Sequence, residues 1–269
     1  MKQYGLIGYP LSHSFSKKYF TQKFEDEGIT DHAYELYELK NLSDLPELLR
    51  AHPGLCGLNV TVPHKIGVMF YLDHVDADAK EVDAVNCIRI KAESPIAAAF
   101  DGEVGIKDHE FRLEGFNTDV YGFEMSLKPL LEAHHTQALV LGAGGASRAV
   151  RYVLNKLNIY SKLVSREPEG DRLGYKDLTP ELISQYKLII NTTPLGMAPD
   201  TDKCPDIPYE ALTGEHLLYD LIYNPAETLF LQKGKAQGAA IKNGHEMLIL
   251  QAERSWEIWN DQVNNPVRS

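Results

Sequence analysis

The stretch LVLGAGGASRA at residues 139–149 decides the fold class, because its glycines lie between an apolar strand pattern and a helix pattern. In such a turn the first glycine, Gly142, permits the tight bend, and the second, Gly144, lets a pyrophosphate approach the backbone. The N-terminus of the helix then offers free N–H groups and the positive end of its dipole to the anion. The third position of the G-x-G-x-x-G pattern is Ser147. The stretch predicts a dinucleotide-binding unit, and the alternative is an ordinary glycine-rich turn.

The end of the next strand, LVSREPEG at residues 163–170, bears on the choice of dinucleotide. An NAD site usually has an acidic residue there, which accepts hydrogen bonds from the ribose hydroxyls. This chain has Ser165 and Arg166, and an arginine can clamp a 2′-phosphate, so NADP is favoured. The neighbouring Glu167 and Glu169 leave NAD possible, and a solvated surface arginine is the plainer alternative.

Strand and helix patterns alternate on both sides of this unit, which predicts an α/β fold. The predicted strands cover residues 4–9, 32–39, 55–62, 85–90, 162–166, 187–194 and 217–223, and a strand, a glycine turn and a helix follow one another over residues 137–159. The other predicted helices cover residues 14–28, 42–52, 76–84, 121–135, 227–238 and 242–260. Residues 91–115 are interrupted by glycines and are interpreted as a β-hairpin excursion.

The overall composition excludes several classes of protein. A net charge of −11 over 269 residues leaves no basic surplus for nonspecific nucleic-acid binding. The apolar runs are too short for a membrane span, and the N-terminus lacks the pattern of a signal peptide. Cys56, Cys87 and Cys204 are odd in number and widely spaced, so we expect neither a disulfide framework nor a metal site, and a cytoplasmic location.

Polar residues stand at several predicted strand ends, where open α/β sheets bind their ligands. Lys65 follows one strand, Asn86 begins another, and Asp119 follows the hairpin segment. Each has an ordinary explanation as a solvated charge, a satisfied buried amide or a helix cap. Their number at the strand ends of one sheet favours a ligand site.

Eight motifs, in order along nearly the whole chain, resemble the shikimate dehydrogenase family. They are GYPLSHSFS, NVTVPHK, DAVNCI, GFNTD, GAGGASRA, NTTPLGM, DLIYNP and GHEMLILQA. The resemblance implies reversible, NADPH-dependent reduction of 3-dehydroshikimate to shikimate, on the route to chorismate and the aromatic amino acids. It also implies a substrate domain at residues 1–118 and 239–269, a Rossmann domain at 119–238, and a last helix that returns to the first domain.

The resemblance further implies a role for individual residues. Lys65 and Asp119 would form the catalytic pair. The substrate would contact Ser14 and Ser16 through its carboxylate and Asn59, Thr61, Asn86 and Gln251 through its hydroxyls, with Tyr223 nearby. The dinucleotide would contact Gly142, Ala143, Gly144, Gly145, Ala146, Ser147, Ser165, Arg166, Thr192, Met197, Leu221, Gly244 and Met247.

Two departures from the family keep alternatives open. Where the family commonly has Asn-Arg-Thr at the 2′-phosphate site, this chain has Ser165, Arg166 and Glu167, and residues 91–115 are longer than the usual link. The alternatives are a relative that prefers quinate or uses NAD, and a catalytically silent sensor of a shikimate-like ligand. We expect a monomer or a homodimer with a small-molecule substrate as its partner.

Overall fold

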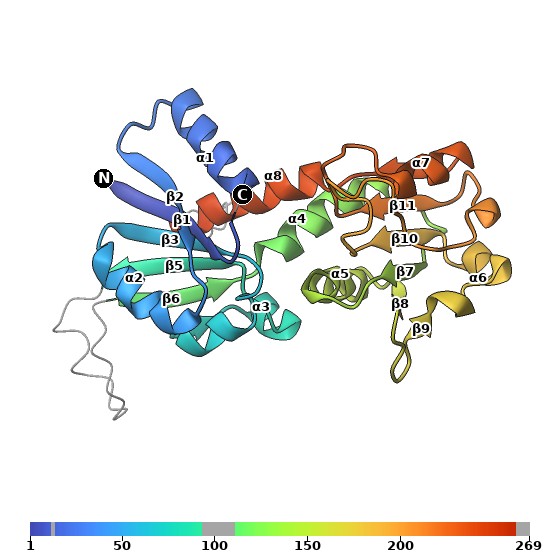
Figure 1. Ribbon diagram of the computed structural model, residues 1–269, viewed down its shortest axis with the longest axis horizontal. Helices are drawn as coiled ribbons and strands as arrows, with labels where there is room; N and C mark the ends of the chain where they lie inside the picture. The colour runs from blue at the N-terminus through green and yellow to red at the C-terminus, as the bar shows by residue number, and fades with distance from the viewer. Residues whose placement is uncertain (12–13, 93–110, 262–269) are drawn as a thin grey trace, which may run out of the picture. The chain divides into compact units, whose positions relative to one another are not determined.

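The computed structural model describes residues 1–11, 14–92 and 111–261 (Figure 1). The chain divides into two compact units, of which the first contains Met1–Thr118 and Ala252–Ser269 and the second contains Asp119–Gln251. We expected the chain to return to the first domain at residue 239, but in the structure it returns at Ala252. The reason is a short strand, β12 (Ala240–Lys242), which pairs in parallel with the second sheet, so that the chain leaves the second unit only within its last helix.

The first unit contains a six-stranded mixed sheet in the order β2-β1-β3-β5-β6-β4. Its strands are β1 (Lys2–Gly8), β2 (His32–Glu38), β3 (Leu55–Val60), β4 (His74–Val75), β5 (Cys87–Ala92) and β6 (Phe111–Phe116). β1 pairs in parallel with β2 and β3, whereas β5 runs antiparallel to both β3 and β6. The central residues of the predicted hairpin, 93–110, lie outside the described residues.

Two apolar clusters cover the two faces of this sheet, because side chains alternate between the faces along each strand. Ile7 faces an aliphatic cluster formed with α2 (Leu45–Ala51), the 3₁₀ helix η2 (Gly67–Tyr71) and α3 (Ala77–Val82). Tyr4 faces an aromatic cluster formed with α1 (Phe15–Asp26) and the end of α8 (His245–Trp259). A further 3₁₀ turn, η1 (Leu42–Asp44), precedes α2.

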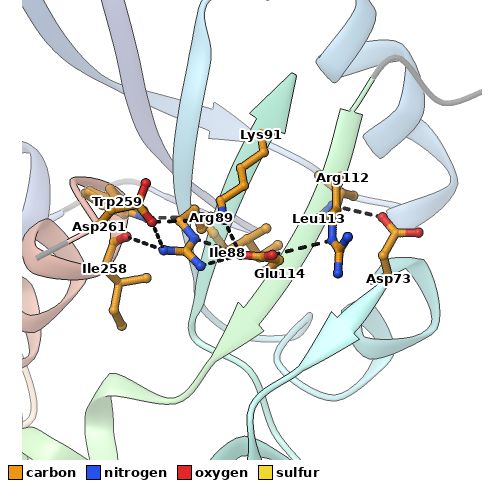
Figure 2. A network of polar contacts seen from close by, with 10 residues as sticks. All are labelled: Asp73, Ile88, Arg89, Lys91, Arg112, Leu113, Glu114, Ile258, Trp259 and Asp261. Atoms are coloured by element: carbon orange, nitrogen blue, oxygen red, sulfur yellow. Dashed lines mark hydrogen bonds and ion pairs between the residues drawn. The ribbon is translucent and has the colours of Figure 1, made fainter. Parts of the chain in front are cut away.

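The end of α8 is bound to the first sheet by polar contacts as well (Figure 2). The indole nitrogen of Trp259 donates to the carbonyl of Ile88 at 3.0 Å. The guanidinium of Arg89 donates to the carbonyl of Ile258 at 3.3 Å and to the carboxylates of Glu114 and Asp261. The expectation that the last helix returns to the first domain is therefore confirmed.

The second unit contains a six-stranded, wholly parallel sheet in the order β12-β11-β10-β7-β8-β9. Its other strands are β7 (Gln137–Leu141), β8 (Tyr160–Ser165), β9 (Leu173–Gly174), β10 (Leu188–Asn191) and β11 (Leu217–Asp220). Its helical segments are α4 (Thr118–Leu127), η4 (Lys128–Leu130), α5 (Gly145–Lys156), η5 (Tyr175–Asp177), α6 (Pro180–Gln185), η6 (Tyr209–Ala211) and α7 (Leu229–Ala236). In chain order the strands read 3-2-1-4-5-6 across the sheet, which is the Rossmann arrangement, so the predicted fold class is confirmed.

Candidate active site and dinucleotide cleft

The strand directions of the first sheet gather three of the sequence motifs at one edge. Asn59, near the end of β3, lies opposite Cys87 at the start of the antiparallel β5. Cys87 in turn lies opposite Phe116, the last residue of β6. The segment leading to Lys65, the residue Asn86 and the segment leading to Asp119 therefore leave the sheet at the same edge.

Asn86 connects these segments through hydrogen bonds in the interior of the first unit. Its side-chain oxygen accepts from the backbone nitrogen of Thr118 at 2.6 Å and from the Thr118 hydroxyl at 3.2 Å. The preceding residue, Val85, donates its backbone N–H to the carbonyl of Lys65 at 2.8 Å. Two consecutive residues thus hold the main chain of Lys65 and that of the residue before Asp119. The side chains of Lys65 and Asp119 are both half-buried.

The predicted substrate residue Asn59 is largely engaged inside the first unit. Its side chain is 5% exposed; its oxygen accepts from the Tyr34 hydroxyl at 2.8 Å and its nitrogen donates to the Ser255 hydroxyl at 2.9 Å. Burial raises the pKa of Tyr34 well above its usual value, so this hydroxyl stays a donor. Asn59 is thereby fixed in orientation, and Thr61, two residues on, is half-buried.

The two predicted carboxylate-binding serines lie at the start of α1. Ser14 is the N-cap of that helix, and its hydroxyl accepts from the backbone nitrogen of Lys17 at 3.3 Å. Ser16 lies two residues further on, in the first turn of the helix, and its side chain interacts with that of Tyr34. Capping therefore accounts for Ser14, and both serines remain partly accessible.

The second unit contains a cleft of about 480 Å³ at the carboxyl ends of its strands. It lies where β7 is flanked by β8 and β10, the point at which the strand order reverses and such sheets bind their ligands. Its lining residues are Gly142, Ala143, Gly144, Ser165, Arg166, Glu167, Arg172, Tyr175, Thr192, Thr193, Pro194 and Leu195. The cleft brings together the glycine turn, the residues after β8 and the loop after β10.

The glycine turn is shaped as its sequence predicts. Gly142 has a φ of +106°, and a Cβ there would lie 2.8 Å from the Thr193 side chain and 2.9 Å from that of Thr192. Gly144 is the N-cap of α5, and a Cβ added to it would meet nothing within 4 Å. The turn therefore needs glycine for its backbone at the first position, and leaves the helix N-terminus open at the second.

Two arginines line the cleft, and the sequence motif revealed only one of them. The exposed side chains of Arg166 and Arg172 both line it, together with Tyr175 and Glu167. Burial raises the pKa of Tyr175, and the charge of Arg166 acts in the opposite direction. Sequence reasoning missed Arg172, and the only available signal was a second arginine shortly after the first. The hydroxyl of Ser165 is occupied locally, since it donates to the carbonyl of Glu167 at 2.7 Å.

Several predicted dinucleotide residues are not among those that line this cleft. They are Gly145, Ala146, Ser147, Met197, Leu221, Gly244 and Met247. The hydroxyl of Ser147 donates back to the carbonyl of Gly144 at 2.7 Å, so it closes the first turn of α5. A Cβ on Gly244 would lie 2.1 Å from the Leu221 carbonyl oxygen, so this glycine permits close packing of two chain segments.

The remaining predicted residues lie in the second unit. Tyr223 is 39% exposed and follows β11. Gln251 is buried on α8, and its side-chain nitrogen donates to the carbonyl of Leu248 at 2.9 Å. Contact of either residue with a substrate stays a prediction.

In the part of the chain that the structure describes, no helix is long and apolar enough to cross a bilayer. Across the same residues, no group of three or more histidine, cysteine, aspartate or glutamate side chains could hold a metal ion.

Comparison with known proteins gives consistent results for both units. The family model of the shikimate dehydrogenase substrate binding domain matches residues 6–88. The shikimate dehydrogenase (NADP(+)) of Clostridium beijerinckii is 38% identical, over 98% of this chain and 94% of the relative. The enzyme of the same name from Methanococcus aeolicus is 35% identical, over 96% and 91%. The crystal structure of shikimate 5-dehydrogenase from Thermus thermophilus, in complex with NADP(H) and shikimate, has a TM-score of 0.79 and 29% identity, over 97% and 94%.

Proposed function

The chain belongs to the shikimate dehydrogenase family: it is an NADP-dependent oxidoreductase that reversibly reduces 3-dehydroshikimate to shikimate, and we propose that Lys65 and Asp119 are its catalytic pair. The observation that carries this assignment of residues is the anchoring of both segments to Val85 and Asn86. One short, buried piece of chain sets the main-chain positions from which both side chains start.

The residues of the second unit fit the dinucleotide. A turn that needs Gly142, an open helix N-terminus at Gly144 and two arginines in the same lining form a set of donors for a pyrophosphate and a 2′-phosphate. Bound there, NADPH supplies the hydride. We assign the 2′-phosphate to Arg166 and Arg172, because a guanidinium pairs with phosphate in a bidentate manner.

Lys65 supplies the charge that the reaction needs at the ketone. Hydride arrival develops negative charge on the carbonyl oxygen, and an ammonium group directed at that atom stabilises the charge and can donate the proton. In this proposal the carboxylate of Asp119 orients the ammonium and favours its charged form. The two groups would titrate as a pair, so their apparent pKa values would belong to the pair.

Five of the proposed substrate residues belong to the first unit. Ser14 and Ser16 would hold the carboxylate, with hydroxyl contacts from Asn59, Thr61 and Asn86. The oxygen and nitrogen of Asn59 already have fixed partners, so the amide cannot flip. It would therefore offer a ring hydroxyl its donor and its acceptor at fixed positions. Gln251 and Tyr223, which belong to the second unit, complete the proposed set.

Two finer points of the assignment are also proposals. The described cysteines are free thiols, which supports a reducing, cytoplasmic compartment. For the oligomeric state we propose a monomer or a homodimer, which light scattering of the purified chain would distinguish.

The decisive experiment measures initial rates with shikimate and with quinate, each with NADP⁺ and with NAD⁺. We expect the highest kcat/KM for shikimate with NADP⁺. A preference for quinate or for NAD⁺ would assign the chain to a different branch of the same chemistry. Saturable binding of shikimate without turnover in any of the four combinations would identify a silent sensor.

A further inference from the structure

A buried hydrogen-bond chain lies behind the dinucleotide cleft and joins the ends of two neighbouring strands. Asn191 is the last residue of β10 and Asp220 the last of β11, and the two are register partners in the parallel sheet. Both side chains are 0% exposed, and the Asn191 side-chain nitrogen donates to Oδ1 of Asp220 at 3.1 Å. Neither residue lines the cleft.

The chain continues from Asn191 into the cleft wall. The side-chain oxygen of Asn191 accepts from the backbone nitrogen of Thr193 at 3.0 Å and from the Thr193 hydroxyl at 2.7 Å. The same hydroxyl accepts from the backbone nitrogen of Leu195 at 3.2 Å. Since Thr193, Pro194 and Leu195 all line the cleft, the Asn191 amide holds the conformation of this wall.

Asp220 is unusual because its partners are all neutral donors. Its carboxylate accepts from the Thr228 hydroxyl at 2.6 Å and from the Ile222 backbone nitrogen at 3.0 Å, besides Asn191. Burial raises the pKa of Asp220 to about 6, because a charged carboxylate costs free energy in the interior. A neutral amide of the same size would avoid that cost.

A carboxylate differs from an amide in that it only accepts hydrogen bonds, so it determines which group of its partner must face it. Facing Asp220, the Asn191 amide has one satisfactory orientation, with its nitrogen towards the carboxylate and its oxygen towards Thr193. An asparagine at residue 220 could present either a donor or an acceptor, and the orientation of Asn191 would no longer be dictated.

We propose that Asp220 is a positioning residue for the dinucleotide, which acts through Asn191 to hold Thr193 and Leu195 in the wall of the cleft. The inference rests on the proposed function, because it takes this cleft to be the NADP site. It adds a residue outside the cleft to those that determine the affinity for NADP.

The test is Asp220→Asn, with NADP⁺ binding measured by isothermal titration calorimetry on the purified full chain. We expect the Kd for NADP⁺ to rise about tenfold, the effect of losing one or two well-made buried hydrogen bonds. The KM for shikimate should stay unchanged and kcat at saturation should stay within about twofold, because ground-state binding of the dinucleotide is what is lost.

A matched control separates positioning from stability alone. Tyr219, on the same strand, shares a buried hydrogen bond of 2.6 Å with Ser126, away from the cleft lining. Tyr219→Phe should lower the free energy of unfolding and leave the Kd for NADP⁺ as it is. A double-mutant cycle adds Thr193→Val: if Asp220 acts through the chain described, its effect on Kd should largely vanish in the Thr193→Val background.

Should Asp220→Asn fail to fold, Thr228→Val and Thr228→Ser give a milder pair. Removal of the hydroxyl should raise the Kd for NADP⁺ about threefold, and serine should retain the wild-type value. An unchanged Kd in the folded variants, or additive effects in the cycle, would overturn the inference while wild-type turnover with NADP⁺ left the proposed function standing. Absence of NADP⁺ binding and turnover in the wild type would instead overturn the proposed function.

Discussion

The side-chain oxygen of Asn86 accepts a hydrogen bond of 2.6 Å from the backbone nitrogen of Thr118, the residue directly before Asp119. Thr118 is 1% exposed, so its N–H has no access to water once that partner is removed. The amide of Asn86 therefore has a structural role at the point where α4 begins, and that helix carries Asp119 in its first turn. A substrate contact by the same amide would come in addition to this bond.

Asn86→Ala should lower the free energy of unfolding by roughly 1–3 kcal/mol, because it leaves a buried donor unsatisfied. It should also lower kcat, since the start of α4 loses its restraint. Urea unfolding and steady-state kinetics measure the two effects. If kcat fell with no change in unfolding, Asn86 would act on the substrate alone and the anchoring of Thr118 would be unimportant.

Lys65→Ala should reduce kcat by about 10²–10⁴-fold, the range of a positioned acid–base group, and leave the Kd for shikimate comparatively intact. Steady-state kinetics and equilibrium binding check this. Lys18→Ala, at a lysine of α1 outside the proposed site, is the matched control and should behave as the wild type. A near-normal kcat in Lys65→Ala would remove this residue from the chemical step.

Arg172→Ala should raise the KM for NADP⁺ about tenfold or more and leave the KM for NAD⁺ nearly unchanged, because only the former has a 2′-phosphate to pair with a guanidinium. Arg166→Ala should act in the same direction. The ratio of kcat/KM for the two dinucleotides is the measurement. Equal losses for both dinucleotides would place Arg172 away from the 2′-phosphate.

Arg89→Met should lower the free energy of unfolding by about 3–5 kcal/mol, because it leaves the buried Glu114 without its main partner. Burial raises the pKa of Glu114, but the hydrogen bond and charge of Arg89 outweigh it, so that the net pKa is lowered. The double variant Arg89→Met/Glu114→Leu should recover much of the loss. Urea unfolding of the three proteins tests this, and an unaltered single variant would show that the network in Figure 2 is dispensable.

The second unit should lose stability as the pH falls below about 6.5, the usual histidine pKa. Burial lowers the pKa of both His135 and His216, so the unfolded chain binds protons that the folded unit does not, and stability drops as the pH passes down through this window. His135→Gln/His216→Gln should flatten that dependence in urea unfolding at pH values of about 7.5 and 5.5, on either side of the usual histidine pKa. An equally steep dependence in the variant would assign the effect to other groups.

Titration of Asp220 changes the pH dependence of stability in the opposite direction, so its effect must be distinguished from that of the histidines. Its pKa is raised from 3.8 to about 6 by burial, so between these values the folded unit holds a proton that the unfolded chain releases. Its contribution therefore makes folding more favourable as the pH falls through that range. Because Asp220 is present in both proteins, its effect cancels when the histidine variant is compared with the wild type.

Local patterns were sufficient for much of the fold. The strand, glycine turn and helix over residues 137–159 could be read because an apolar run, two glycines and a helical periodicity follow one another directly. The strands β4, β9 and β12 were missed, since two or three residues carry no periodicity and exist only through pairing with a neighbour. Because β12 was missed, the expected domain boundary was placed at residue 239, before this strand.

For the site, the sequence by itself determined the chemistry on offer: a lysine, a carboxylate, a glycine turn and an arginine, in the order of a known family. Only the tertiary structure decided which hydrogen-bond partners fix these side chains and which further residues join them. The amide of Asn59 has fixed partners in Tyr34 and Ser255, Arg172 joins the cleft, and Asp220 stands behind its wall. The physical reason is that hydrogen-bond partners and cleft linings are set by strand register and crossover connections, which bring together residues far apart in the chain and leave no local pattern in it.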